Sequence, residues 1–213
     1  MRVAVVGATG GVGRHVVDLA LAAGHDVRAI ARDPKKLHRV HERLAPFPGD
    51  ARTGAGLLEA IDRCALVISC LGTRRGEAPV VAVGTRHLVE ACTAAGVGRL
   101  AIITSLGVGE SRDQALRTGF AGTVFFRVIA PLFLRRAFAD LEEAERAARA
   151  APFPVVCVRP GGLTDEPPVG AVVAVGPDLD LPGRIPRADV AAFLLSLVHE
   201  TRWDGKAVSI GAR

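Results

Sequence analysis

The sequence lacks most of the side chains that move protons in enzymes. It contains no tyrosine, its lysines are confined to Lys35, Lys36 and Lys206, and no histidine lies between His87 and His199. A Tyr-x-x-x-Lys pair, in which the lysine tunes the pKa of a proton-donating tyrosine, therefore cannot form. A reaction that needs a strong general acid finds few candidates in the second half of the chain.

Metal and nucleic-acid sites also find little support. The four cysteines (Cys64, Cys70, Cys92, Cys157) show no C-x-x-C spacing and lie in apolar runs, so we interpret them as buried reduced thiols and expect no metal site. The net charge is +5, but the arginines are dispersed along the whole chain. Positive charge that is dispersed in this way indicates a solvated surface, so we expect no nucleic-acid partner.

Long hydrophobic runs are missing as well. The most apolar stretch, FAGTVFFRVIAPLFLRR, is interrupted by Arg127 and Pro131 before it is long enough to cross a bilayer. Segment 120–134 fits either a face that joins two copies into a homodimer or a lid over a binding site. The chain begins in a strand-like run without a signal-peptide pattern, so we expect a cytoplasmic protein with no membrane partner.

Strand-like and helix-like segments alternate along the chain. Apolar runs without alternation predict strands buried on both faces at 2–8, 26–32, 65–72, 99–107, 153–162 and 206–211. Helical spacing predicts helices at 14–24, 56–61, 84–96, 138–151 and 187–200. This order predicts a doubly wound parallel sheet, the Rossmann α/β fold, as a single domain over residues 1–213. Residues 164–186, rich in proline and glycine, are expected to form a small irregular lobe.

The stretch GATGGVG joins the first predicted strand to the first predicted helix. Gly7 permits a sharp exit from the strand, Gly10 allows close approach of a pyrophosphate, and Gly13 lets the helix pack on the strand. The first amides of that helix have no internal partners, so an anion fits there. The pattern predicts a dinucleotide site, with an unliganded tight turn as the alternative.

Arg32 bears on which dinucleotide is bound. It stands at the end of the second predicted strand, where an acidic residue would read the ribose 2′-hydroxyl of NAD(H), and Lys35 and Lys36 follow it. A guanidinium can hold a 2′-phosphate through two hydrogen bonds, so we predict NADP(H) in preference to NAD(H). Asp33 complicates this reading, because it could accept a hydrogen bond from a ribose hydroxyl. The alternative for Arg32 is an exposed charge at a strand end.

The ends of the later strands supply the other candidates. Ligands of open parallel sheets lie beyond the carboxyl ends of the strands, which places Gly72 and Thr73 along the cofactor and Thr104 and Ser105 near its nicotinamide. Residues 160–163 would form a wall or floor of the site. Asp50 is either a neighbour of the adenine or the cap of the following short helix.

Several motifs together resemble a known family. The stretches GATGGVG, ARD, GD, CLGTR, VVAVGTRHLVEA, ITS, RPGGLTDEP and IPRADVAAFLL follow the order and spacing of atypical short-chain dehydrogenases/reductases of the NAD(P)H-binding group, which includes NmrA-like proteins. The chain looks most similar to the biliverdin reductase B/flavin reductase type, over nearly its whole length. The resemblance is specific for fold and cofactor but much less so for substrate, because the group contains reductases, isomerase-like enzymes and inactive sensors.

The resemblance implies a role for each motif. The pyrophosphate would be held by Gly7, Ala8, Thr9, Gly10, Gly11, Val12 and Gly13, and the 2′-phosphate by Arg32. Asp50 and Ala51 would flank the adenine, and Cys70, Leu71, Gly72, Thr73 and Arg74 would lie along the nicotinamide ribose. Ser105 would be the active-site serine beside Thr104, and Pro160, Gly161, Gly162 and Leu163 would contact the nicotinamide end.

Two departures from the family pattern bear on the chemistry. The Tyr–Lys pair of most short-chain dehydrogenases is absent, and Gly162 stands where the biliverdin reductase B type has a histidine. Carbonyl reduction without a general acid is disfavoured, whereas a flavin or quinone takes hydride directly and can take its proton from solvent. We therefore predict an NADPH-dependent oxidoreductase that transfers hydride to a small, planar, conjugated acceptor.

Other readings of the function and of the acidic residues stay open. The chain could be a non-catalytic NADP(H) sensor of the NmrA type, or an isomerase or epimerase that retains its cofactor. Asp140, Glu142, Glu143 and Glu145 are interpreted as a solvated helix face. Asp165 is interpreted as a loop carboxylate, with a general-acid role as the alternative.

Overall fold

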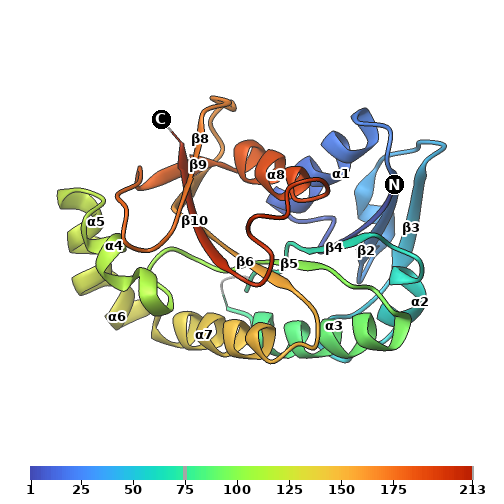
Figure 1. Cartoon of the computed structure of the whole chain (residues 1–213), viewed down its shortest axis with the longest axis horizontal. Coiled ribbons are helices and arrows are strands. Elements are labelled where there is room, and N and C mark those ends of the chain that lie inside the picture. Colours follow the sequence, from blue (N-terminus) through green and yellow to red (C-terminus); the bar gives the residue numbers. More distant parts are fainter. Residues whose placement is uncertain (74–75, 213) are drawn as a thin grey trace.

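The computed structural model describes residues 1–73 and 76–212 (Figure 1). Its centre is an eight-stranded sheet with the strand order β3-β2-β1-β4-β5-β6-β10-β8. The strands are β1 (Arg2–Val6), β2 (Asp26–Ala31), β3 (Leu44–Pro48), β4 (Leu66–Ser69), β5 (Leu100–Ile103), β6 (Val155–Pro160), β8 (Val172–Val175) and β10 (Ala207–Ala212). All neighbouring pairs are parallel except β8 and β10, which are antiparallel. The predicted doubly wound α/β fold is confirmed.

Helices cover both faces of the sheet (Figure 1). Helices α1 (Gly11–Ala22) and α8 (Arg187–Ser196) pack on one face, and α2 (Leu57–Ile61), α3 (Val81–Ala95) and α7 (Arg135–Arg149) pack on the other. Successive residues of β1 enter opposite cores: Val3 and Val5 join the first, and Ala4 and Val6 the second. This two-sided burial explains why the strand sequences show no polar alternation.

The two ends of helix α3 are fixed in different ways. The helix ends at Gly96, which adopts φ +67° in the left-handed region, as its position after the apolar periodicity predicts. At the other end, the Asp140 carboxylate accepts hydrogen bonds from the amides of Val81 (2.9 Å) and Ala82 (3.1 Å). Asp140 therefore caps a distant helix, and the interpretation of it as a merely solvated side chain is wrong.

The lobe predicted at 164–186 lies beside β10 and contains regular pieces. β7 (Gly162–Thr164) and β9 (Arg184–Pro186) form a separate parallel pair, and β8 extends the main sheet. The chain between β5 and α7 forms short turns of helix: η2 (Gly109–Ser111), α4 (Arg112–Leu116), α5 (Phe120–Val124), a π-helical turn (Phe125–Ile129) and α6 (Ala130–Phe133). A short 3₁₀ turn, η1 (Pro34–Leu37), follows β2. Among the described residues, no helix combines the length and the apolarity needed to cross a membrane.

Candidate functional site

The turn between β1 and α1 is built for close backbone approach. Gly7 has φ +76°, and the amide of Gly10 donates a hydrogen bond to the Gly7 carbonyl at 2.9 Å. A Cβ built on Gly13 would lie only 2.3 Å from that same carbonyl oxygen. Helix α1 therefore sits directly on the turn, which only glycine at position 13 permits.

The N-terminus of α1 offers unpaired amides to a ligand. Gly10 is its N-cap residue, no side chain caps the helix, and its first turn contains no acidic residue. The first amides of a helix carry partial positive charge and have no partner within the helix. An anionic group approaching the turn would meet these amides without competition from a capping side chain.

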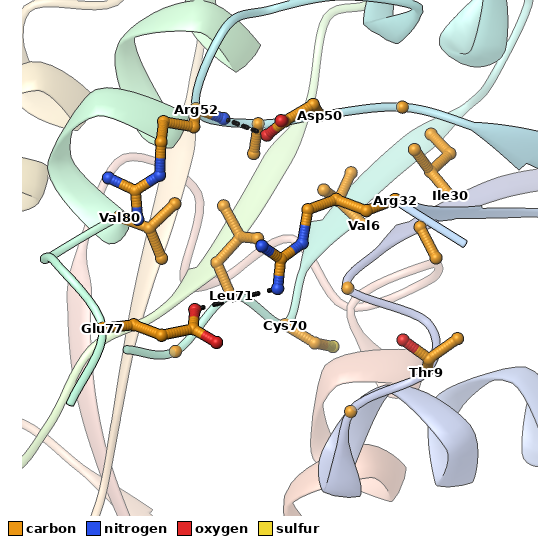
Figure 2. A pocket seen from close by; sticks show the side chains of 16 residues that line it. Val6, Thr9, Ile30, Arg32, Asp50, Arg52, Cys70, Leu71, Glu77 and Val80 are labelled. Atoms are coloured by element: carbon orange, nitrogen blue, oxygen red, sulfur yellow. Dashed lines mark hydrogen bonds and ion pairs between the residues drawn. The ribbon is translucent and has the colours of Figure 1, made fainter. Parts of the chain in front are cut away.

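A cleft opens from this turn across the carboxyl ends of β2, β3 and β4 (Figure 2). The site residues predicted from sequence that line it are Gly7, Thr9, Gly10, Arg32, Asp50, Ala51, Cys70, Leu71 and Gly72. Ala8 and Val12 are buried behind the turn instead, and Thr73 accepts a hydrogen bond from the amide of Val80 (3.4 Å). Arg74 lies outside the described residues. The structure therefore brings predicted residues from the ends of four strands, β1 to β4, together in one cleft.

Asp50 orders the wall of the cleft. Its Oδ1 accepts a hydrogen bond from the amide of Arg52 at 2.8 Å (Figure 2). The Arg52 guanidinium in turn donates to the carbonyls of Ala78 and Pro79. Helix α2 begins after Gly56 and has no side-chain cap. The reading of Asp50 as a helix cap is therefore wrong, because the chain makes a further turn between Asp50 and the helix.

Arg32 projects into the cleft and faces an acid that sequence reasoning missed. Its guanidinium lies 3.7 Å from the carboxylate of Glu77, and the two side chains are 58% and 40% exposed (Figure 2). Asp33, the acid weighed from the sequence, pairs with Lys36 at 3.6 Å and does not line the cleft. Nothing in the local sequence marks Glu77, because it reaches Arg32 from a loop after a different strand.

A second cavity of about 760 Å³ lies beyond the ends of β5 and β6. Thr104, Ser105, Pro160, Gly161, Gly162 and Leu163, all predicted as site residues, line it. Most of the other wall residues are apolar or glycine, and the cavity includes the aromatic rings of Phe125, Phe126 and Phe138. No tyrosine, lysine or histidine is among the described residues that line either the cleft or this cavity.

Segment 120–134 covers the cavity with one side and exposes the other. Gly122, Phe125, Phe126 and Leu134 line the cavity, which is the arrangement expected of a lid. The opposite side exposes large apolar side chains: Phe120, Val124, Val128, Ile129, Leu132 and Phe133. The homodimer reading of this segment stays a prediction.

The hydroxyl groups at the end of β5 are tied to the protein. Ser105 Oγ donates to the carbonyl of Leu106 at 3.0 Å, and Thr104 Oγ1 donates to Glu145 Oε1 at 2.9 Å. Glu145 is only 1% exposed. Its interpretation as part of a solvated acidic face is therefore wrong, because α7 turns this carboxylate towards the sheet.

A buried ion-pair network holds Glu145. Arg159, on β6 and 1% exposed, donates to Glu145 through Nε (2.8 Å) and Nη2 (2.6 Å), and its Nη2 also reaches Glu110 at 2.6 Å. The hydrogen bond from Arg159 holds the pKa of Glu110 below its usual value. The sequence signal that could have found this network is a single arginine inside the buried strand VVCVRP.

Asp165 lies outside both cavities. Its side chain is 89% exposed and pairs with Arg187 at 2.6 Å, which fits the loop-carboxylate reading better than a general acid in a closed site. Cys70 lies in the cleft, where burial raises the pKa of its thiol to about 12, so it stays protonated at neutral pH.

Comparison with known proteins agrees with this geometry. The family model described as NAD(P)H-binding matches residues 7–201. An uncharacterized chloroplastic protein of Arabidopsis thaliana is 30% identical over 223 residues, covering 100% of this chain and 77% of that protein. The structure of ChuY from Escherichia coli, described as an anaerobillin reductase, superposes with a TM-score of 0.81 at 25% identity, covering 99% of this chain and 96% of that one. A short-chain dehydrogenase/reductase from Veillonella parvula in complex with NADP shares the fold, with a TM-score of 0.81 at 14% identity over 99% of this chain and 94% of that one.

Proposed function

The chain belongs to the NAD(P)H-binding family, and on that premise we propose that it is an NADPH-dependent oxidoreductase that transfers hydride to a small, planar, conjugated acceptor. The observation that carries the proposal is the aromatic-lined cavity at the ends of β5 and β6, next to the strand ends that form the cleft. The cavity offers rings for a flat ligand and no strong acid. That combination suits an acceptor that needs positioning more than it needs a proton donor.

The residues present fit a nicotinamide dinucleotide. The uncapped start of α1 and the glycine cradle suit a diphosphate, because a Cβ at Gly13 would collide with the turn. Arg32 would leave its ion pair with Glu77 and bind the 2′-phosphate of NADPH. The Glu77 carboxylate could instead accept a hydrogen bond from the 2′-hydroxyl of NADH. The pair therefore predicts a preference for NADPH over NADH that is limited in size. Cys70 and Leu71, from the end of β4, would line the path of the cofactor.

The proposed mechanism relies on orientation. A nicotinamide held in the cleft would supply the hydride. Phe125, Phe126 and Phe138 hold the acceptor ring flat and exclude water from one side, and Ser105 and Thr104 offer hydroxyl oxygens at the inner wall. The hydrogens of both hydroxyls are already donated to the protein, so solvent delivers the proton to the reduced acceptor.

Consumption of NADPH tests this proposal. We expect the purified protein to oxidise NADPH in the presence of a flavin or a quinone and to show little turnover with simple ketones. The variant Arg32→Ala should raise KM for NADPH about tenfold while leaving KM for NADH nearly unchanged, because only the 2′-phosphate contact is lost. Absence of turnover across flavins, quinones and conjugated tetrapyrroles would overturn the enzymatic reading.

A non-catalytic NADP(H) sensor is the second candidate. It is favoured by the lack of any tyrosine, lysine or histidine among the described wall residues, and by the exposed apolar side of segment 120–134, which could contact a protein. This reading predicts similar affinities for NADPH and NADP⁺. Steady-state turnover with any acceptor would eliminate it.

A further inference from the structure

A second arginine lies against the glycine turn. Arg187 is the first residue of α8, and its side chain reaches across to the start of α1. A Cβ built on Gly11 would lie 2.9 Å from Cδ of Arg187 and 3.0 Å from its Nε. The Arg187 side chain is 28% exposed and therefore remains partly accessible to solvent.

Positive charge converges at this point. Helices α1 and α8 pack side by side (Figure 1). At the start of α8, the Arg187 side chain overlies Gly11, the first residue of α1. The start of α1 has no acidic residue and no side-chain cap. In the first turn of α8, the carboxylate of Asp189 is already bound to the amides of Val169 (2.9 Å) and Gly170 (3.1 Å).

An arginine at this place is unfavourable unless an anion joins it. The N-terminus of a helix carries a partial positive charge, so a cationic side chain at that position is destabilised by repulsion. The partner that the structure shows for Arg187 is Asp165, an 89% exposed carboxylate at 2.6 Å. An ion pair with so exposed a member contributes little to stability, so the pair alone does not account for the arrangement.

The two-stranded sheet of β7 and β9 sets the position of Arg187. β7 and β9 pair in parallel with Thr164 opposite Pro186, so the loop after β7 and the start of α8 emerge together. Leu163 and Arg184 on these same strands line the aromatic cavity. The strand that leads into Arg187 therefore borders the cavity, while the Arg187 side chain itself lies against the glycine turn.

We propose that Arg187 binds the diphosphate bridge of the nicotinamide cofactor over the start of α1, on the side that faces the aromatic cavity. The inference rests on the proposed function, since it assumes that a dinucleotide occupies the cleft. A guanidinium donates two parallel hydrogen bonds to a phosphate and adds a full charge to the partial charges of the amides. Arg32 and Arg187 then read different phosphates: the 2′-phosphate and the bridge.

Calorimetric titration with NADPH and NADH separates the two arginines. The bridge is common to both nucleotides, so Arg187→Ala should weaken both by about tenfold or more and leave their affinity ratio unchanged. Arg32→Ala should weaken NADPH alone. The matched control is Arg202→Ala, which removes an exposed arginine paired with Glu200 beyond the other end of α8 and should change neither affinity.

Two further variants distinguish binding from a structural role. Asp165→Asn removes the ion pair but leaves the guanidinium, and is expected to keep or tighten the affinity for NADPH. Arg187→Lys keeps the charge without the planar fork and is expected to give an intermediate loss, which also serves if Arg187→Ala does not fold. Thermal unfolding of each variant checks the fold.

Each outcome has a distinct meaning. If the wild-type protein binds neither nucleotide, the proposed function fails. If the wild-type protein binds but Arg187→Ala, or Arg187→Lys in its place, binds equally well, only the present inference fails. Equal weakening by Arg187→Ala and Asp165→Asn would also overturn it, because it would assign the effect to the ion pair.

Discussion

Replacement of Gly13 by alanine tests whether helix α1 must sit directly on the glycine turn. The added Cβ would lie 2.3 Å from the Gly7 carbonyl oxygen and 3.0 Å from Cα of Ala8. An ordinary contact is about 3.5 Å, so the helix would have to retreat by about 1 Å. All of the atoms it meets are backbone, so no side chain can rotate away to relieve the contact.

The size of the effect follows from two opposing contributions. Overpacking of a rigid site costs about 3 kcal/mol, and the better helix propensity of alanine returns about 1 kcal/mol. The net loss of about 2 kcal/mol in the free energy of unfolding corresponds to a Tm lower by about 4–8 °C for a chain of this length. The retreat of α1 also withdraws its first amides, so NADPH should bind at least about tenfold more weakly.

The matched control is Gly98→Ala. A Cβ added to Gly98 meets no atom within 4 Å and the residue has no positive φ, so this variant should stay within about 0.5 kcal/mol of the wild type. Differential scanning calorimetry gives Tm, and titration calorimetry gives the affinity for NADPH. If Gly13→Ala matches Gly98→Ala in both measurements, the close packing of helix on turn is not what holds the cofactor.

Three further predictions concern stability and reactivity. Glu145→Gln should lower the free energy of unfolding by about 3 kcal/mol in urea titrations, because it leaves the buried Arg159 with only the exposed Glu110 as a charged partner. The exposed control Glu90→Gln should change it by less than about 0.5 kcal/mol. Burial, and then the nearby N-terminal ammonium, lower the pKa of His25, so the folded state resists protonation of this side chain. The free energy of unfolding should therefore fall as the pH drops below about 6.5. His25→Asn should reduce this dependence on pH, and an unchanged dependence would refute the assignment to His25. Burial raises the pKa of the Cys64 thiol to about 11. Iodoacetamide should therefore label this thiol much more slowly in the folded protein than in urea at neutral pH. Equal labelling rates would contradict this prediction.

Much of the fold could be predicted from sequence because the core imposes simple patterns. β1 and β4 are buried on both faces, and each is apolar except at one end, where Arg2 begins β1 and Ser69 ends β4. The glycine turn was equally readable, because Gly7 and Gly13 are required by a positive φ and by a close backbone contact. Positions of this kind follow from local geometry, which a sequence records directly.

The parts that the sequence did not reveal depend on contacts between distant segments. Glu145 looks like any surface glutamate on an acidic helix until α7 packs and brings it to Arg159. Glu77 reaches Arg32, and Asp140 reaches the start of α3, from segments far away along the chain. Partnerships between charged side chains leave no periodic signal, so they emerge only once the elements are assembled.

The cytoplasmic location, the homodimer and the choice of acceptor stay predictions.

The place of β10 in the sheet has a consequence for shortened chains. This strand, the last in the sequence, fills the gap between β6 and β8, and its Ile210 is fully buried. A polypeptide interrupted before Ala207 would leave β6 with an open hydrogen-bonding edge and β8 without a neighbour. Such exposed edges recruit strands from other molecules, so a chain cut before this strand should aggregate rather than merely lose activity.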